Sequence, residues 1–266
     1  MIGIVGSCCV DELLYVDFLP SSSQDARILQ RELKLGGCAY YVAKAIPNCV
    51  LVSSVGIGYY GDFVVKNIVK EDLDFVLIPR KEENGVCICE IEKDGQRTFL
   101  SYQGAEYDLS DPLSDELEDM DWLYLSGIDL ENNMDLLDKV KDKHLFISCG
   151  PRHSKLDLDR IFSFHPILHM NRQECEEITG LPLKQGIRKL YDLVQNVVFV
   201  TDGQNGSYGY DGKLYYQPSV PVVAKNSVGA GDSHAGVCLK GVSENCALDD
   251  ILIQANAYAA KVLESK

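Results

Sequence analysis

Residues 226–233 read Asn226-Ser227-Val228-Gly229-Ala230-Gly231-Asp232-Ser233, and an apolar segment, 234–239, follows them directly. Small residues let the backbone approach a ligand, and the amides of Gly229, Ala230 and Gly231 would lie at the positive end of the helix that the apolar segment predicts. This turn can therefore hold an anion without Lys or Arg. A lone Asp in such a first turn is usually a helix cap, but Asp232 adjoins an anion site, where it would place a base beside a transferring phosphoryl group.

The rest of the chain alternates short apolar runs with helix-like segments, which is typical of a parallel sheet covered on both faces. Residues 50–55, 122–126 and 197–201 are three of the predicted strands. Residues 172–179 predict a helix that ends at Gly180, because glycine suits the left-handed conformation after a helix. The predicted fold class is therefore α/β.

Two segments, about 11–35 and 85–103, interrupt this alternation. The first has no helical pattern, and the second resembles a hairpin that turns at Lys93-Asp94-Gly95-Gln96. Because a single hairpin is marginally stable alone, we expect the two segments to pair as a small β lid on the main sheet. No linker marks a second independent domain, so we expect one domain over 1–266.

The charge of the chain limits its partners. It has 266 residues, with 40 acidic and 25 basic side chains and a net charge of −15, and it has no basic stripe, so we expect no nucleic-acid partner. It shows neither a signal-peptide pattern nor a run of roughly 18 apolar residues, which predicts a cytoplasmic protein without a membrane partner. Most of the 10 cysteines lie in apolar runs, which favours reduced core thiols over disulfides.

Two further patterns are compatible with other functions. Gly56-Ile57-Gly58-Tyr59-Tyr60-Gly61 has the glycine spacing of a dinucleotide-binding turn, but Pro79-Arg80-Lys81 stands where an acidic ribose ligand is expected. Glycines that only permit a tight turn are the simpler interpretation. Cys87 and Cys89 would project from one face of a strand, yet zinc sites usually have a two-residue gap and a second ligand pair, so a metal site there is disfavoured.

Five segments resemble, in chain order, the motifs of the PfkB/ribokinase family of carbohydrate and nucleoside kinases. Gly36-Gly37-Cys38-Ala39-Tyr40-Tyr41-Val42-Ala43 resembles the first signature of the family, and 226–232 resembles its second signature, Asp-Thr-x-Gly-Ala-Gly-Asp. The other three segments are Val55-Gly56-Ile57-Gly58-Tyr59-Tyr60-Gly61, Asn171-Arg172-Gln173-Glu174 and Thr201-Asp202-Gly203-Gln204-Asn205-Gly206. The resemblance covers nearly the whole chain and implies a ribokinase-like three-layer sandwich with a central, mostly parallel sheet and a small β lid.

The resemblance implies ATP-dependent phosphorylation of a hydroxyl group, with Mg²⁺ accompanying ATP. Asp232 would take the proton from the acceptor hydroxyl, and Gly229, Ala230 and Gly231 would hold the charge that develops on the γ-phosphoryl group. No residue is assigned as a direct metal ligand.

The resemblance also implies a nucleotide region. Asn171 and Glu174 would organise the magnesium and phosphate region through ordered water, although from the residues alone they suit a helix cap with a first-turn acid. The resemblance implies that Thr201, Gly203 and Gly206 lie along the nucleotide and that Asn256 lies near its adenine.

On the acceptor side, the resemblance implies that Asp11 holds sugar hydroxyls and that the Gly36-Gly37 turn opens a helix under the sugar. Asp11 alone would be a solvated turn residue. Arg152 resembles the Arg of an Asp-Pro-Gly-Pro-Arg stretch found in some members, and would either face the site or pair with a surface acid. Tyr41 stands where the family usually has an Asn that hydrogen-bonds the sugar.

Other departures from the family concern the acceptor half. Cys9 replaces a polar sugar contact, and Gly58 and Ser148 each replace an Asp. Asn226 replaces the Asp that in many members helps to build a monovalent-cation site, so the resemblance does not carry over potassium activation. We therefore expect an unusual acceptor, such as a substituted ketose or a nucleoside.

Two further classes of function remain open at this point. A non-catalytic nucleotide-binding regulator would explain the altered acceptor residues, but it would not require Asp232 to stay beside the glycine turn. A nicotinamide oxidoreductase would require the acidic ribose ligand that the sequence lacks. An exposed face of the lid could pair with a second copy, so a homodimer through the lid also remains open.

Overall fold

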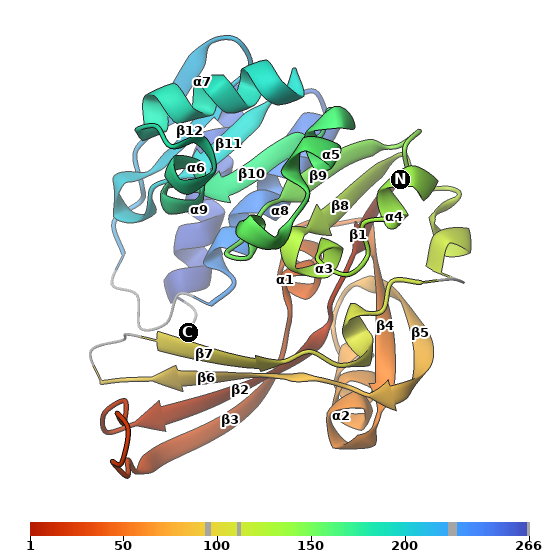
Figure 1. The fold of residues 1–266 in the computed structure, drawn as a ribbon, viewed down its shortest axis with the longest axis vertical. Coiled ribbons are helices and arrows are strands. Elements are labelled where there is room, and N and C mark those ends of the chain that lie inside the picture. Colours follow the sequence, from red (N-terminus) through yellow and green to blue (C-terminus); the bar gives the residue numbers. More distant parts are fainter. Residues whose placement is uncertain (94–96, 111–112, 223–227, 265–266) are drawn as a thin grey trace.

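Two sheets form the framework of the protein (Figure 1), and the computed structural model describes residues 1–93, 97–110, 113–222 and 228–264. Within these residues the larger sheet has nine strands, in the order β13-β12-β11-β10-β9-β8-β1-β4-β5. Its strands are parallel from β11 to β5, and β12 and β13 extend it as antiparallel strands. The predicted mostly parallel sheet is confirmed.

The strands of the larger sheet are β1 Ile2–Val5, β4 Cys49–Ile57, β5 Asp74–Glu83, β8 Trp122–Ser126, β9 His144–Ser148, β10 Ile167–Asn171, β11 Val198–Thr201, β12 Ser207–Tyr210 and β13 Leu214–Gln217. The α-helices are α1 Cys38–Lys44, α2 Gly58–Ile68, α3 Gly127–Leu130, α4 Leu136–Lys139, α5 Leu158–Ser163, α6 Arg172–Thr179, α7 Leu183–Val194, α8 Ala230–Ser243 and α9 Leu248–Glu264. Short 3-10 helices lie at Ala105–Tyr107, Leu113–Leu117, His153–Lys155 and Gly203–Asn205.

Helices cover both faces of this sheet and complete a three-layer sandwich. Side chains alternate across the strands, so Tyr124 and Phe146 pack on the face covered by α1, α2, α8 and α9, while Leu125 and Ile147 pack on the face covered by α3 to α7 (Figure 1). All four side chains are fully buried. These strands are continuous apolar runs in the sequence because their side chains are buried on both faces of the sheet. No helix among the described residues is long and apolar enough to cross a membrane.

The second, smaller sheet is built from the two segments that were predicted to pair as a lid. It has the order β3-β2-β6-β7, with β2 Cys9–Val16, β3 Ile28–Gly36, β6 Val86–Ile91 and β7 Arg97–Tyr102. Strands β2 and β6 are parallel neighbours, so the two interruptions in the sequence do pair with one another. The predicted turn at Lys93-Asp94-Gly95-Gln96 lies largely outside the described residues.

The glycines that mimic a dinucleotide turn serve the packing of the chain itself. The Gly56 amide donates a hydrogen bond to Asn84 Oδ1 at 3.0 Å. A Cβ atom at Gly56 would lie 2.5 Å from the Glu82 carbonyl oxygen, and one at Gly61 would lie 2.0 Å from the Gly56 carbonyl oxygen. The end of β5 and Asn84 fill the space beside Gly56, and the backbone of Gly56 itself fills the space beside Gly61, which supports the interpretation of both as tight-turn residues.

Candidate active site

Helix α8 begins at the glycine turn that the sequence singles out. Gly229 is the N-cap residue and has a left-handed backbone, with φ 74°. A Cβ atom there would also lie 2.6 Å from the ring of Tyr41, so both the backbone and the neighbouring ring require glycine. Asp232 follows in the first turn of α8. Asn226 and Ser227, which begin the motif, lie outside the described residues.

Asp232 lies in the wall of a cavity of about 560 Å³. Burial raises the pKa of this carboxyl to about 7, and the nearby carboxylates of Asp11, Asp129 and Glu174 act in the same direction. The neighbouring Cys38 thiol acts in the opposite direction and lowers the pKa of Asp232. A carboxyl group that is half ionised near neutral pH is suited to accept and release a proton.

Four of the five predicted acceptor residues line this same cavity, namely Asp11, Gly37, Tyr41 and Arg152, whereas Gly36 is not part of its lining. The Tyr41 hydroxyl donates a hydrogen bond to Asp11 Oδ2 at 2.6 Å, and burial beside Asp11 raises the pKa of Tyr41. Asp11 is only 5% exposed, so it is not the solvated turn residue that an isolated Asp would be.

The Gly36-Gly37 turn allows the close approach of three backbone segments. A Cβ atom at Gly36 would lie 2.1 Å from the Asp11 carboxyl carbon. Gly37 has φ 98°, and a Cβ atom there would lie 2.3 Å from the Ser7 carbonyl oxygen. Both glycines therefore let α1 begin directly against β2, which carries Asp11, and against the backbone of Ser7 just before that strand.

Arg152 has both of the environments that the sequence suggests. Its guanidinium lines the cavity, and its Nη1 atom donates to Glu131 Oε2 at 2.8 Å. The ion pair with Glu131 holds the guanidinium in place, and Arg152 remains part of the cavity wall.

Asn171 and Glu174 form a complete capping box at the start of α6. Asn171 Oδ1 accepts from the Glu174 amide at 2.9 Å, and Glu174 Oε2 accepts from the Asn171 amide at 3.1 Å. Burial raises the pKa of Glu174. The structural interpretation of this pair is thus correct, and both residues also line the 560 Å³ cavity, so a role toward a ligand stays a prediction.

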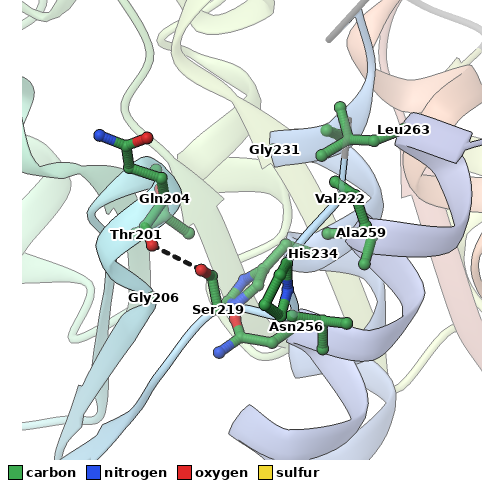
Figure 2. Close-up of a pocket in the computed structure, with 15 residues that line it drawn as sticks. Thr201, Gln204, Gly206, Ser219, Val222, Gly231, His234, Asn256, Ala259 and Leu263 are labelled. Carbon is green, nitrogen blue, oxygen red and sulfur yellow. Dashed lines mark hydrogen bonds between the residues drawn. The ribbon is translucent and has the colours of Figure 1, made fainter. Parts of the chain in front are cut away.

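A second cavity, of about 630 Å³, lies between α8, α9 and the turn after β11 (Figure 2). This cavity is lined by the four residues that the family resemblance assigns to a nucleotide, namely Thr201, Gly203, Gly206 and Asn256. Its apolar wall consists of Val220, Pro221, Val222, Ala259, Ala260 and Leu263. This wall can accommodate a flat apolar ring system.

The side-chain amide of Asn256 forms hydrogen bonds with other residues of the protein. Its Nδ2 atom donates to the carbonyl oxygens of Gln217 and Pro218, at 3.1 and 3.0 Å, and its Oδ1 atom accepts from the Ser207 hydroxyl at 2.9 Å. Asn256 therefore holds the segment after β13 against α9 and gives the cavity its shape.

The two cavities meet at the beginning of α8. Thr201 and Gly231 line both of them, and Asp232 lies in the first cavity next to this junction. Helix α8 begins at this junction, and the first amides of a helix have no partner within the helix, so they can bind an anion that passes from one cavity to the other. This arrangement is suited to transfer of an anionic group between two bound molecules.

Three residues of the site have no role assigned in the sequence analysis. Cys38 lines the 560 Å³ cavity together with Asp232, and His169 Nε2 lies 3.0 Å from His234 Nδ1. Burial lowers the pKa of His169 and lowers that of His234 to about 4, so both rings are neutral at pH 7. Two of the three had a signal in the sequence: Cys38 lies within the first signature, and His169 is two residues before Asn171 and thus on the same face of a strand.

Most of the cysteines are buried, and no disulfide joins any of the ten. Burial raises the pKa of Cys87, whose sulfur accepts from the Ser101 hydroxyl at 3.7 Å. Cys89 packs with Leu13 and Ile91 in the lid. Among the described residues, no three His, Cys, Asp or Glu side chains are grouped so that they could hold a metal ion.

Comparison with solved structures shows the fold. The ribokinase of Thermotoga maritima superimposes with a TM-score of 0.87 at 22% sequence identity, covering 99% of this chain and 93% of that one. The ribokinase of Arabidopsis thaliana, solved with ribose and ATP, superimposes with a TM-score of 0.80 at 19% identity, covering 98% of this chain and 92% of that one. The predicted ribokinase-like sandwich is confirmed.

Sequence comparison gives the family. An uncharacterized sugar kinase, YegV, of Escherichia coli K12 is 28% identical over 98% of this chain and 87% of its own length. The cytidine kinase of Thermococcus kodakarensis is 28% identical over 58% of this chain and 59% of its own length. A family profile described as pfkB family carbohydrate kinase matches residues 1–266. The chain therefore belongs to the pfkB family of carbohydrate kinases.

Proposed function

We propose that this protein transfers the γ-phosphoryl group of ATP to a hydroxyl group of a sugar or a sugar-like small molecule. The observation that carries the proposal is the position of Asp232, in the cavity wall beside the α8 N-terminus where the two cavities meet. ATP is assigned to the 630 Å³ cavity, because that cavity has an apolar wall and opens onto the α8 amides. The acceptor is assigned to the 560 Å³ cavity under the lid.

The proposed reaction needs one base and one anion site. The acceptor hydroxyl gives its proton to Asp232 while its oxygen bonds to the γ-phosphorus, and the bond between that phosphorus and the bridging oxygen breaks as ADP leaves. The amides of Gly229, Ala230 and Gly231 face the negative charge that builds up on the transferring group. Asp232 must be ionised at the start, which its pKa of about 7 allows at neutral and higher pH.

The lid supplies the exclusion of water that this chemistry requires. Arg97, Phe99 and Ser101 of β7 line the acceptor cavity together with Asp11 of β2. A closed lid would keep water from taking the place of the acceptor hydroxyl, and so would limit wasteful hydrolysis of ATP.

The carboxylates of Asp232 and Glu174 on the same cavity wall fit a hard cation, because Mg²⁺ prefers oxygen ligands and usually binds through one or two carboxylates together with phosphates. When it is bound, Mg²⁺ would offset the charge of the ATP phosphates. Glu174 is assigned to this region, and Asn171 would hold it in place through the capping box.

A nucleoside is the second candidate for the acceptor. The cavity is lined by the rings of Tyr41, Phe99 and Tyr107, which could contact a planar base. The similarity to a cytidine kinase supports the same class of acceptor. A sugar remains the first candidate, because the family match extends over the whole chain.

The test is an ADP-release assay with ATP and Mg²⁺ over a panel of pentoses, hexoses, ketoses, sugar acids and nucleosides. The matched control is Asp232→Asn with the same panel, because any release that survives in this variant is independent of the proposed base. We expect acceptor-dependent release by the wild type alone. Tight ATP binding without release for any acceptor would instead support a nucleotide-binding regulator.

A further inference from the structure

Two buried histidines connect the two cavities. His169, on β10, lines the 560 Å³ acceptor cavity, and His234, on α8, lines the 630 Å³ nucleotide cavity. His169 Nε2 lies 3.0 Å from His234 Nδ1, which is a hydrogen-bond distance. The two residues are only 5% and 2% exposed, and the His169 ring also stacks on Phe146. A hydrogen bond between fixed rings therefore joins the wall of one cavity to the wall of the other.

The outer nitrogens of this pair have no partner within the protein. Among the described residues nothing hydrogen-bonds His234 Nε2, although this atom is buried. In the same part of the chain, the bond to His234 is the only hydrogen bond of the His169 ring, which leaves His169 Nδ1 available. Buried polar groups are nearly always paired, so an unpaired nitrogen in a cavity wall indicates a place for a ligand.

The short distance between the inner nitrogens determines where the protons lie. Both rings are neutral, because burial lowers the pKa of His169 and lowers that of His234 to about 4. Each ring therefore carries one proton, and one proton must lie between the rings, since two would clash and none would leave two lone pairs facing one another. If His169 is the donor, its Nδ1 is bare and His234 Nε2 carries a proton. If His234 is the donor, both are reversed, so the outer nitrogens always have opposite hydrogen-bonding character.

The surroundings of His234 favour the arrangement in which its Nδ1 is bare. The Cys238 sulfur lies 3.5 Å from this atom, and burial raises the pKa of Cys238, so the thiol keeps a proton that it can donate to Nδ1. His234 Nε2 then carries a proton and can donate to a ligand in the nucleotide cavity. A nucleoside suits this donor, because its ribose oxygens and most of its ring nitrogens are acceptors.

His234 lies near the region assigned to the nucleoside and away from the amides assigned to phosphate. It is three residues beyond Gly231, or about 4.5 Å further along α8. Asn256, which the family resemblance places near adenine, is its neighbour in the wall of the cavity (Figure 2). A proton on His234 Nε2 is therefore placed to meet the ribose or the base.

We propose that His234 donates a hydrogen bond from Nε2 to the nucleoside part of ATP, while His169 accepts one at Nδ1 from a hydroxyl of the acceptor. Because the proton between the rings ties these two contacts together, each ligand stabilises the arrangement that the other requires, and the two bind with positive coupling. The identity of the two ligands rests on the proposed function, whereas the opposite character of the outer nitrogens does not. No covalent bond to either ring is made, and the pair takes up and releases no net proton.

The first experiment locates the protons in the wild type by NMR at pH 7, with ¹⁵N-labelled histidine, because the shift of each ring nitrogen shows whether it carries a proton. We expect Nε2 protonated and Nδ1 bare in both His169 and His234. Addition of ADP should move the His234 Nε2 signal and leave that of His144, an exposed ring at the start of β9, unchanged. A proton on Nδ1 of either ring, or a His234 Nε2 signal that ADP does not move, would overturn the proposal.

The second experiment measures the dissociation constants of ADP and of tripolyphosphate by calorimetry. His234→Phe keeps an aromatic ring without a donor, so ADP should bind roughly threefold to tenfold more weakly, as expected for one hydrogen bond, while tripolyphosphate, which has no nucleoside, should bind as in the wild type. His144→Phe is the matched control, because it makes the same exchange in an exposed ring that stacks on Trp122, and it should change neither value. Unchanged ADP binding in His234→Phe, or equal weakening for both ligands, would overturn the proposal.

The coupling is tested with an acceptor identified in the ADP-release assay. In Asp232→Asn, which should bind both ligands without turnover, a saturating acceptor should lower the dissociation constant of ATP. Adding His169→Phe to this variant should reduce that effect by threefold or more, and an effect of the same size would overturn the coupling. If no acceptor is phosphorylated, the proposed function fails, and the NMR and ADP measurements still decide the roles of His234 and of the proton between the rings.

Discussion

The hydroxyl of Tyr41 donates a hydrogen bond to Asp11 Oδ2 at 2.6 Å and so joins helix α1 to the lid strand β2. The family resemblance implies that Asp11 binds sugar hydroxyls and that an Asn usually stands in place of Tyr41. One of the two acidic oxygens is therefore already occupied by a tyrosine, and the ring takes up space where an acceptor would lie. This relationship explains why an unusual acceptor is expected.

Tyr41→Asn should change the relative turnover of different acceptors by tenfold or more, which corresponds to the ~1.4 kcal/mol expected when one hydrogen-bonding group is gained or lost. The variant shortens the side chain and frees Asp11 Oδ2 for an acceptor hydroxyl. The measurement is kcat/KM for each acceptor that the wild type phosphorylates. Tyr41→Phe is the matched control, because it loses the hydroxyl and keeps the ring. An unchanged order of acceptors in Tyr41→Asn would mean that Tyr41 does not take part in acceptor choice.

The rate of phosphoryl transfer should fall as the pH decreases through about 7, because Asp232 must be ionised to accept a proton and burial raises its pKa to about that value. The measurement is kcat over pH 5 to 9 at saturating ATP and acceptor. A rate that stays constant down to pH 5 would show that no group with this pKa limits the reaction.

Stability should respond to pH in the opposite direction. The pKa of Asp232 is about 7 in the folded protein and near 3.8 when unfolded, so between these values the folded state holds a proton that the unfolded state has lost. Stability due to this group therefore decreases from pH 4 to pH 7 and stays low above it. Asp232→Asn should have a higher Tm than the wild type at pH 8, and the difference should vanish near pH 4. A difference in Tm that is constant over this range would contradict the shifted pKa.

Hydrogen exchange in the lid should slow when an acceptor binds. Strands β2, β6 and β7 of the small sheet line the acceptor cavity, and β3 pairs with β2, so a bound acceptor would hold the small sheet closed. The measurement is amide exchange with and without the acceptor, compared in the wild type and in Asp232→Asn, which should still bind the acceptor. Protection confined to the strands of the larger sheet would show that the segments do not act as a lid.

The sequence predicted those helices and strands whose ends and burial are determined by residues close to them in the chain. Helix α6 spans Arg172–Thr179 as predicted, because Asn171 caps its start and Gly180 adopts the left-handed conformation at its end. The lid was also predicted, since two β-rich segments without helical periodicity have few other ways to bury their apolar faces. The antiparallel strands β12 and β13 were not predicted, because short strands rich in Tyr and Gly give no strong periodic signal.

The contacts within the site were harder to predict than its residues. The glycine turn and Asp232 are contiguous, so their relationship can be seen in the sequence. The bond between Tyr41 and Asp11 spans 30 residues, and that between His169 and His234 spans 65. Cys38 and Asp232 reach the same cavity because α1 packs against α8 through Gly236, and no local pattern encodes that packing.

The most direct test of the account is the turnover of Asp232→Asn beside its affinity for ATP. Asn keeps the size and hydrogen bonding of Asp and caps helices about as well, so the variant should fold and should bind ATP as tightly as the wild type or more tightly. Loss of a general base typically costs about 10²- to 10⁴-fold in rate, so we expect turnover to fall by that factor. Wild-type turnover in a correctly folded Asp232→Asn protein would contradict the account, because Asp232 would then be a capping residue and not the base.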